Sequence, residues 1–157
     1  MLIGMLFIAA IMVVITCVVH LAGLVGLSHV MRRQRVHPAN LTTVLGQGFA
    51  IIVYVLTIFA LHSLQIWIYA FAFLFGGAFD SIHDALYYSI SSFTTVGYGD
   101  INPAGHWRIL GATESANGFL LIGWSTAFLV SVSTKVRMFE ASLEDGWVKP
   151  DEHSKKV

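Results

Sequence analysis

The residues with the most evident chemistry form the string TTVGYGD, from Thr94 to Asp100. A partly dehydrated cation such as K⁺ needs oxygens to replace its water, and an extended chain with every carbonyl on one side supplies a dense row. That conformation alternates left-handed and right-handed backbone angles, and glycine reaches positive φ without a Cβ clash. Gly97 and Gly99 lie two residues apart, as this alternation requires. The string therefore predicts a cation-coordinating loop.

The expected K⁺ ligands are the carbonyls of four consecutive residues, with a hydroxyl oxygen at the inner end: Thr95 (carbonyl and hydroxyl), Val96, Gly97 and Tyr98, followed by Gly99. One chain supplies one wall of such a cage, so four chains must meet on an axis. The alternative is a glycine turn that happens to contain a tyrosine. The position of the string between two membrane-length apolar segments argues against that alternative.

The composition is that of a membrane protein. Of the 157 residues, 56% are hydrophobic and 11% are charged, whereas soluble domains carry about 25% charged residues. The formal net charge is zero, which gives no reason to expect nucleic acid as a partner. No Ser/His/Asp set, phosphate loop or metal cluster is visible, so we expect neither an enzyme nor a cofactor other than K⁺ as the permeant ion.

Three segments are long and apolar enough to cross a bilayer, which takes about 20 residues in a helix. They are approximately residues 2–27, 45–75 and 109–132. The expected fold is an all-α integral membrane protein with three transmembrane helices per subunit, a re-entrant pore helix and a filter loop. The expected divisions are an additional N-terminal helix (1–28), a basic cytoplasmic linker (29–44), a pore module (45–136) and a short charged cytoplasmic tail (137–157), with no soluble regulatory domain.

Basic residues predict the orientation in the cell membrane. Eight of the nine Lys and Arg residues fall in the link after the first span or after the third span, and Arg108 alone lies on the filter side. We therefore expect the link and the C-terminus in the cytoplasm, with the N-terminus and the filter mouth outside. A cleaved signal peptide at 1–27 is disfavoured, because the segment has no basic start and its apolar run is too long.

A short helix over about residues 82–94, capped by Asp80 or Ser81, is expected to lead into the filter. Its negative C-terminal end would favour a cation in the cavity below. The irregular filter backbone is tolerated at membrane depth because protein surrounds it.

With these elements in place, residues 45–136 resemble the outer helix, pore helix, filter and inner helix of bacterial two-transmembrane potassium channels of the KcsA type. The resemblance implies a homotetramer in the lipid bilayer that conducts K⁺ selectively and passively through one central pore. The first span lies outside the resemblance, so its role is not carried over.

The resemblance also implies roles for residues around the filter. Tyr98 would pack outward against Tyr87 and Tyr88, and Asp100 would form a hydrogen bond behind the filter mouth. Ser91 stands where the prototype has a buried glutamate, and the two tyrosines stand where it has two tryptophans. On the inner helix, the implied gating and cavity residues are a hinge glycine, three cavity-facing residues and one near the cytoplasmic constriction: Gly118, then Phe119, Ile122 and Thr126, then Val130.

Three polar residues inside the spans need separate explanations. Glu114 lies three residues before Asn117, so both occupy one helix face. It serves either as an interior residue bonded to the pore helix for packing, or as a filter support that replaces the missing acid by bonding to Ser91 or Ser92. For His20 and His62, no metal-ligand spacing is present, and hydrogen bonds to neighbouring helices are the expected use. A proton-sensing role for His20, His29 or His37 is the alternative.

Three functions fit a membrane chain with this loop. The first is a K⁺ channel, without voltage sensing because no span carries a ladder of arginines. The second is a pore subunit of a K⁺ transporter, which the intact GYG and the single pore module argue against. The third is a non-conducting adaptor that presents its first span to a partner.

Overall fold

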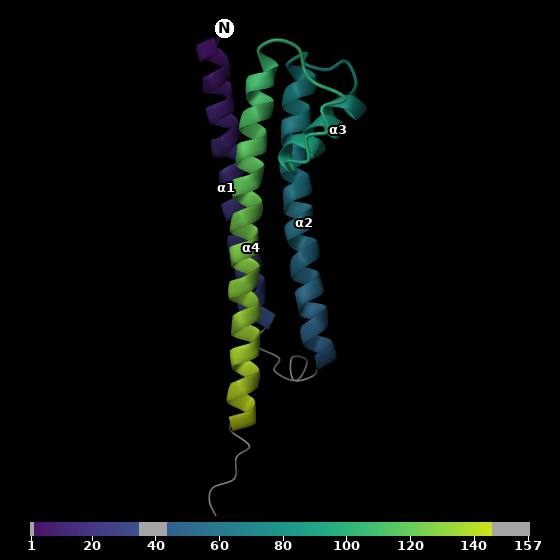
Figure 1. The fold of residues 1–157 in the computed structure, drawn as a ribbon. Coiled ribbons are helices and arrows are strands. Elements are labelled where there is room, and N and C mark those ends of the chain that lie inside the picture. The colour runs from purple at the N-terminus through teal and green to yellow at the C-terminus, as the bar shows by residue number, and fades with distance from the viewer. Residues whose placement is uncertain (1, 35–43, 146–157) are drawn as a thin grey trace, which may run out of the picture.

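The computed structural model describes residues 2–34 and 44–145, which form four α-helices. They are α1 (Leu2–Gln34), α2 (Val44–Phe75), α3 (Ile82–Phe93) and α4 (Trp107–Asp145). Three long helices run alongside one another, and the short α3 lies tilted beside α2 at the end of the bundle that holds the N-terminus (Figure 1). The described residues contain no strand, so the all-α fold class is confirmed.

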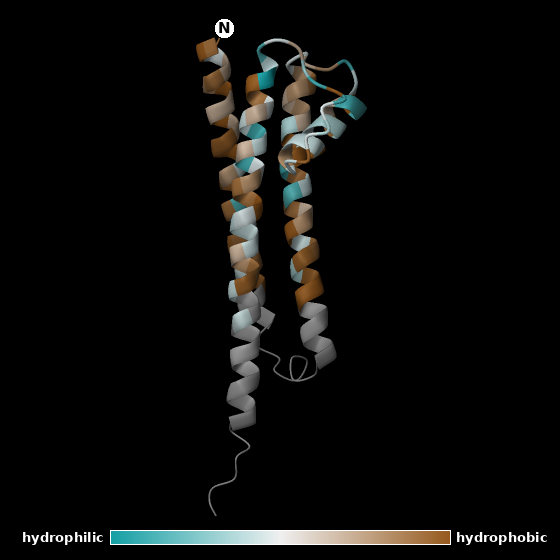
Figure 2. Cartoon of the chain, viewed as in Figure 1, coloured by the Kyte–Doolittle hydropathy of each residue, from teal (hydrophilic) through white to brown (hydrophobic). Residues whose placement is uncertain are grey.

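Two of the described helices are long and apolar enough to cross a membrane, over Leu2–Val30 and Ile51–Phe75. Hydrophobic residues cover α1 and much of α2, whereas the segment around α3 is more polar (Figure 2). Many large apolar side chains are exposed on the long helices, such as Phe7, Phe59 and Phe119. A soluble monomer rarely exposes so much apolar surface, and a lipid-embedded subunit does.

The helices are longer than the predicted spans. The first continues to Gln34, beyond residue 27, and α4 continues to Asp145, well into the predicted tail. Most of the predicted cytoplasmic linker (35–43) and the end of the tail (146–157) lie outside the described residues.

The short helix α3 begins and ends close to the predicted positions. Ser81, with extended backbone angles, caps its N-terminus by accepting a hydrogen bond from the His83 N–H at 3.1 Å. This satisfies one of the free donors of the first turn. The helix ends at Phe93 with Thr94 as its C-cap, so the filter string begins where the helix stops.

A buried aromatic and aliphatic core joins α2, α3 and α4. Tyr69 and Phe73 of α2, Phe93 of α3, and Leu110 and Leu121 of α4 are almost fully buried. This core fixes the short helix between the two long helices, and with it the loop that follows.

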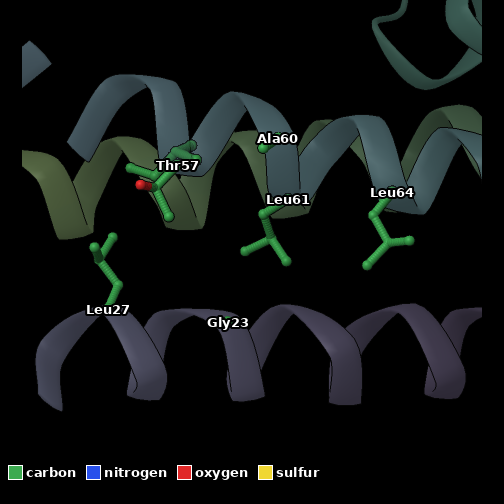
Figure 3. Close-up of a pocket in the computed structure, with 7 residues that line it drawn as sticks. Gly23, Leu27, Thr57, Ala60, Leu61 and Leu64 are labelled. Atoms are coloured by element: carbon green, nitrogen blue, oxygen red, sulfur yellow. The ribbon is translucent and has the colours of Figure 1, made fainter. Parts of the chain in front are cut away.

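The N-terminal helix packs directly on both α4 and α2. Of its small residues, Ala9 is buried and Gly23 lies under Leu61, where an added Cβ would come within 2.6 Å of that side chain. Gly4 and Gly26, by contrast, have open space around the Cβ position. Next to Gly23 lies an apolar pocket of about 280 Å³ between α1 and α2, into which Leu61 and other apolar side chains project (Figure 3).

Candidate ion-selectivity site

The filter backbone is left-handed at every second residue. Thr95, Gly97 and Gly99 have φ angles of 61°, 59° and 77°, while Val96 and Tyr98 between them are not left-handed. The two glycines were expected to adopt this conformation, and Thr95 adopts it as well. Positive φ at a β-branched residue is a true outlier, and strain of this kind costs about 1–3 kcal/mol and concentrates at functional sites.

Main-chain hydrogen bonds attach this strained loop to the end of α3. The Thr95 N–H donates to the Ser92 carbonyl at 2.9 Å, and the Gly97 N–H donates to the Ser91 carbonyl at 3.1 Å. The Tyr98 N–H donates to the Ser91 hydroxyl at 3.2 Å. Ser91, in place of the prototype's acid, thus supports the filter with both its hydroxyl and its carbonyl.

The carbonyls of the filter are left available by this arrangement. Within the described chain, no hydrogen bond reaches the carbonyl oxygens of residues 95–98. In a trans peptide the carbonyl points opposite the N–H, so the bonds donated by Gly97 and Tyr98 direct the carbonyls of Val96 and Gly97 away from α3. The alternating hand of the backbone favours the same side for the carbonyls next to them. Four adjacent carbonyls of one chain can then act together as cation ligands.

Side chains close the outer end of the filter. The Asn102 amide donates to the Gly99 carbonyl at 2.8 Å, and the Tyr87 hydroxyl donates to the Asp100 carboxylate at 2.8 Å. This hydrogen bond to Asp100 raises the pKa of Tyr87 above its usual range. The Tyr87 ring also stacks on the Tyr98 ring, with centroids 6.5 Å apart.

The second tyrosine of the pair lies elsewhere within the chain. The Tyr88 ring packs against Phe73 and Phe79, with centroids 5.2 and 5.3 Å away, and not on Tyr98. Its hydroxyl occupies the space in which a Cβ at Gly111 would lie. Tyr88 therefore holds α3 against α2 and α4, while Tyr87 contacts the filter.

Glu114 is fully buried and bonds to α3, but through a residue other than the two expected. The Ser89 hydroxyl makes hydrogen bonds both to the Ile66 carbonyl at 2.9 Å and to Oε1 of Glu114, whereas the bond predicted to Ser91 or Ser92 is not found. A hydroxyl carries one proton, and the Ile66 carbonyl can only accept it. Both bonds are therefore satisfied together when the Glu114 carboxyl is protonated and donates to Ser89. The other oxygen, Oε2, is buried without a partner among the described residues, which costs less in a neutral acid than in a carboxylate.

The predicted gating residues occupy two kinds of place. Gly118 packs against the main chain of Phe93 at the end of α3, and α4 continues through it as helix. Its lack of a side chain is required for helix contact in this state. The other four, Phe119, Ile122, Thr126 and Val130, are exposed on the single chain. Exposure of this kind is what residues facing a central cavity or a neighbouring subunit show.

Polar groups of α1 also bond to the other helices, an arrangement that the sequence did not reveal. The Asn117 amide of α4 donates to the Thr16 hydroxyl at 2.7 Å and to the Tyr69 hydroxyl at 3.1 Å. Nearby, His20 and His62 stack with ring centroids 5.4 Å apart. The histidines were expected to bond to neighbouring helices separately, and their meeting depends on the packing of segments far apart in sequence.

Comparison with known proteins agrees with this geometry. A family model described as ion channel matches residues 49–135, more than half of the chain. No curated protein and no solved structure matches the chain. The match includes α3, the filter string and most of α2 and α4, and leaves α1 outside. The chain therefore belongs to the ion channel family, with a pore domain of the potassium-channel type and an additional N-terminal helix.

Proposed function

We propose that this chain is the subunit of a homotetrameric channel that conducts K⁺ selectively and passively across the cell membrane. The observation that carries the proposal is the filter backbone, left-handed at Thr95, Gly97 and Gly99. With the N–H groups of residues 95, 97 and 98 bonded to α3, the loop has a row of carbonyls from residue 95 to residue 98 that accept no hydrogen bond within the described chain. Such a row can replace the hydration shell of K⁺.

The tetramer follows from the number of ligands. One filter strand covers one side of an ion, and closure around an axis requires further copies of the same strand. The exposed apolar side chains of α4, such as Phe119 and Val130, support contacts with neighbouring subunits or a central cavity. Native mass measurement in detergent should give four chains, and a conducting sample that contains only monomers or dimers would contradict the tetramer.

Orientation is proposed from charge and from the fold together. The N-terminal end of α1 and the filter loop lie at the same end of the bundle (Figure 1). Eight of the nine basic residues lie in the last turn of α1 or just after it, or in the C-terminal part of α4 and beyond it, which favours the cytoplasm for those segments. The filter mouth and the N-terminus then face outside.

The direct test is flux through purified protein in liposomes loaded with K⁺. A Cβ at Gly97 meets no neighbouring atom, so the effect of Gly97→Ala is confined to strain in the left-handed backbone. This strain should distort the carbonyl row and abolish selective K⁺ flux. Gly105→Ala is a matched control, since Gly105 also has positive φ (58°) and open space but lies outside the filter. Each change costs about 1–2 kcal/mol of backbone strain. A protein that gives no K⁺ flux while it is folded and tetrameric would instead be an adaptor.

A further inference from the structure

Four buried or half-buried side chains from three helices form a closed ring of hydrogen-bond contacts. Gln65 contacts both histidines, through Nε2 to Nδ1 of His20 at 3.1 Å and through Oε1 to Nδ1 of His62 at 3.0 Å. The Ser125 hydroxyl contacts the other nitrogen of each histidine, Nε2 of His20 at 3.4 Å and Nε2 of His62 at 3.1 Å. We call these four residues the polar ring.

The donors and acceptors of the polar ring can be assigned. The Gln65 amide nitrogen also donates to the main-chain oxygen of Thr16 at 3.2 Å, which fixes the orientation of the amide. Nδ1 of His20 must then accept, so the proton of His20 is on Nε2 and is donated to Ser125. Ser125 donates its own proton to Nε2 of His62, whose proton is on Nδ1 and is donated to Gln65. Every member is satisfied, provided that both histidines are neutral and have opposite tautomers.

The surroundings of the polar ring contain few other titratable groups. Within the described chain, His62 faces His20 of α1 and Ser125 of α4, and His20 also packs against Trp124 of α4. From α3, Phe93 packs on His62 with centroids 5.6 Å apart. On its own helix, Gln65 faces His62.

Other titratable residues of the interior have separate partners. Glu114 bonds to Ser89, Tyr69 bonds to Asn117, and the Cys17 thiol also points to Asn117. An asparagine amide cannot relay protons. The polar ring is therefore a separate titrating unit.

The two histidines differ in what a second proton would meet. On His20 it would go to Nδ1, where the Gln65 amide also donates, so two donors would face each other. On His62 it would go to Nε2, where Ser125 can change from donor to acceptor by turning its own proton to a main-chain carbonyl one turn earlier in α4. Because His62 is also partly exposed whereas His20 is fully buried, His62 is the site where a proton enters with least disruption.

A charge on His62 would act on the pore. Phe93, which packs on the His62 ring, is the last residue of α3 and directly precedes the filter string. The C-terminal end of a helix carries about half a negative charge, which favours a cation near the inner end of the filter. The whole positive charge of a protonated His62 beside the end of α3 would more than offset this partial negative charge. In a homotetramer it would do so in each subunit.

We propose that the polar ring is a proton-binding switch: His62 takes up one proton from water on Nε2 under acidic conditions, and the resulting imidazolium lowers K⁺ conduction. This inference rests on the proposed K⁺ channel function.

The tautomers provide a test that does not depend on conduction. Solid-state nuclear magnetic resonance of the full chain in bilayers, with ¹³C and ¹⁵N imidazole signals assigned through the backbone, should give opposite neutral tautomers for His20 and His62 near neutral pH. On acidification His62 should become imidazolium before His20. Identical tautomers, or protonation of His20 first, would overturn the assignment.

Liposome K⁺ flux then tests the consequence. Wild-type flux should fall on the order of tenfold at about pH 5, below the ~6.5 at which a free imidazole titrates. His62→Gln should keep its neutral-pH flux at that pH. A control that combines His29→Gln, His83→Gln and His106→Gln removes described histidines outside the polar ring and should show the full wild-type decrease.

The outcomes separate the two proposals. Absence of K⁺ flux at neutral pH would refute the channel function, with the proton site still judged by resonance. Normal flux at neutral pH with no acid decrease, or an equal decrease in His62→Gln, would overturn the switch. If His62→Gln does not fold, Ser125→Ala takes its place and should alter the acid decrease, because the polar ring is then open before any proton arrives.

Discussion

Gly118 of α4 lies so close to the main-chain oxygen of Phe93, the last residue of α3, that a Cβ at position 118 would collide with it. The inner helix therefore rests directly on the end of the helix that supports the filter. Any movement of α4 at this level must either carry the filter support with it or open a gap beneath it. Gly118 is thus a contact between the inner helix and the filter, in addition to the hinge role that the resemblance implies.

Gly118→Ala should separate α4 from α3. The added methyl meets main-chain atoms, which cannot turn away as a flexible side chain can, and overpacking of this kind costs about 1–3 kcal/mol. We expect a lower thermal midpoint of the tetramer together with reduced K⁺ flux. Gly26→Ala, in the open space of α1, is the control and should leave both unchanged. Equal thermal midpoints and equal K⁺ flux in the two variants would contradict the close contact between Gly118 and Phe93.

The bond between Tyr87 and Asp100 should hold the filter mouth. Tyr87→Phe removes the donated hydrogen bond without changing the ring, so the tetramer should assemble while sustained K⁺ flux declines. Asp100→Asn should cause a similar decline, and the double variant should be no worse than either single variant. Additive effects of the two changes would show that the residues act separately.

The same bond predicts a pH dependence. Because Asp100 raises the pKa of Tyr87, the bond contributes fully below the ordinary tyrosine pKa of about 10 and is lost as pH rises through the raised value. In a titration followed by tyrosinate absorbance, the wild type should ionise one tyrosine later than Asp100→Asn does. If the titration curves of the wild type and Asp100→Asn coincide, Asp100 does not raise the pKa of Tyr87 and the predicted pH dependence is wrong.

Glu114 should tolerate replacement of its acid group by an amide better than loss of its shape. If its carboxyl is neutral and donates to Ser89, then Glu114→Gln retains a donor in the same place, whereas Glu114→Ala leaves Ser89 without that donor. We expect Ala to cost about 1–3 kcal/mol and to alter open probability or selectivity, with Gln between Ala and the wild type. Thermal stability and single-channel recordings measure the two effects. If both variants conduct normally and only stability falls, Glu114 serves packing alone.

The filter and its supporting helix were largely predictable because their signals are local. The two-residue spacing of Gly97 and Gly99 predicted the alternation, and Ser81 predicted the start of α3 within a residue. The left-handed Thr95 was not predictable, since a β-branched residue avoids positive φ unless long-range bonds hold it there.

Side-chain partners between helices were harder to predict. Ser89, Ser91 and Ser92 are close in sequence, and which of them meets Glu114 depends on the rotation of α3 against α4. The pairing of His20 with His62 needs α1 and α2 in register, which no periodicity in either segment specifies. The contact role of Gly118 likewise depends on the distance between two helices.

The most direct measurement of the central claim is the reversal potential of the purified channel in planar bilayers, with K⁺ on one side and mixed K⁺ and Na⁺ on the other. A row of carbonyls from Thr95 to Tyr98 in four copies predicts a reversal potential close to the K⁺ equilibrium value. A reversal potential that corresponds to equal permeability for K⁺ and Na⁺ would contradict it.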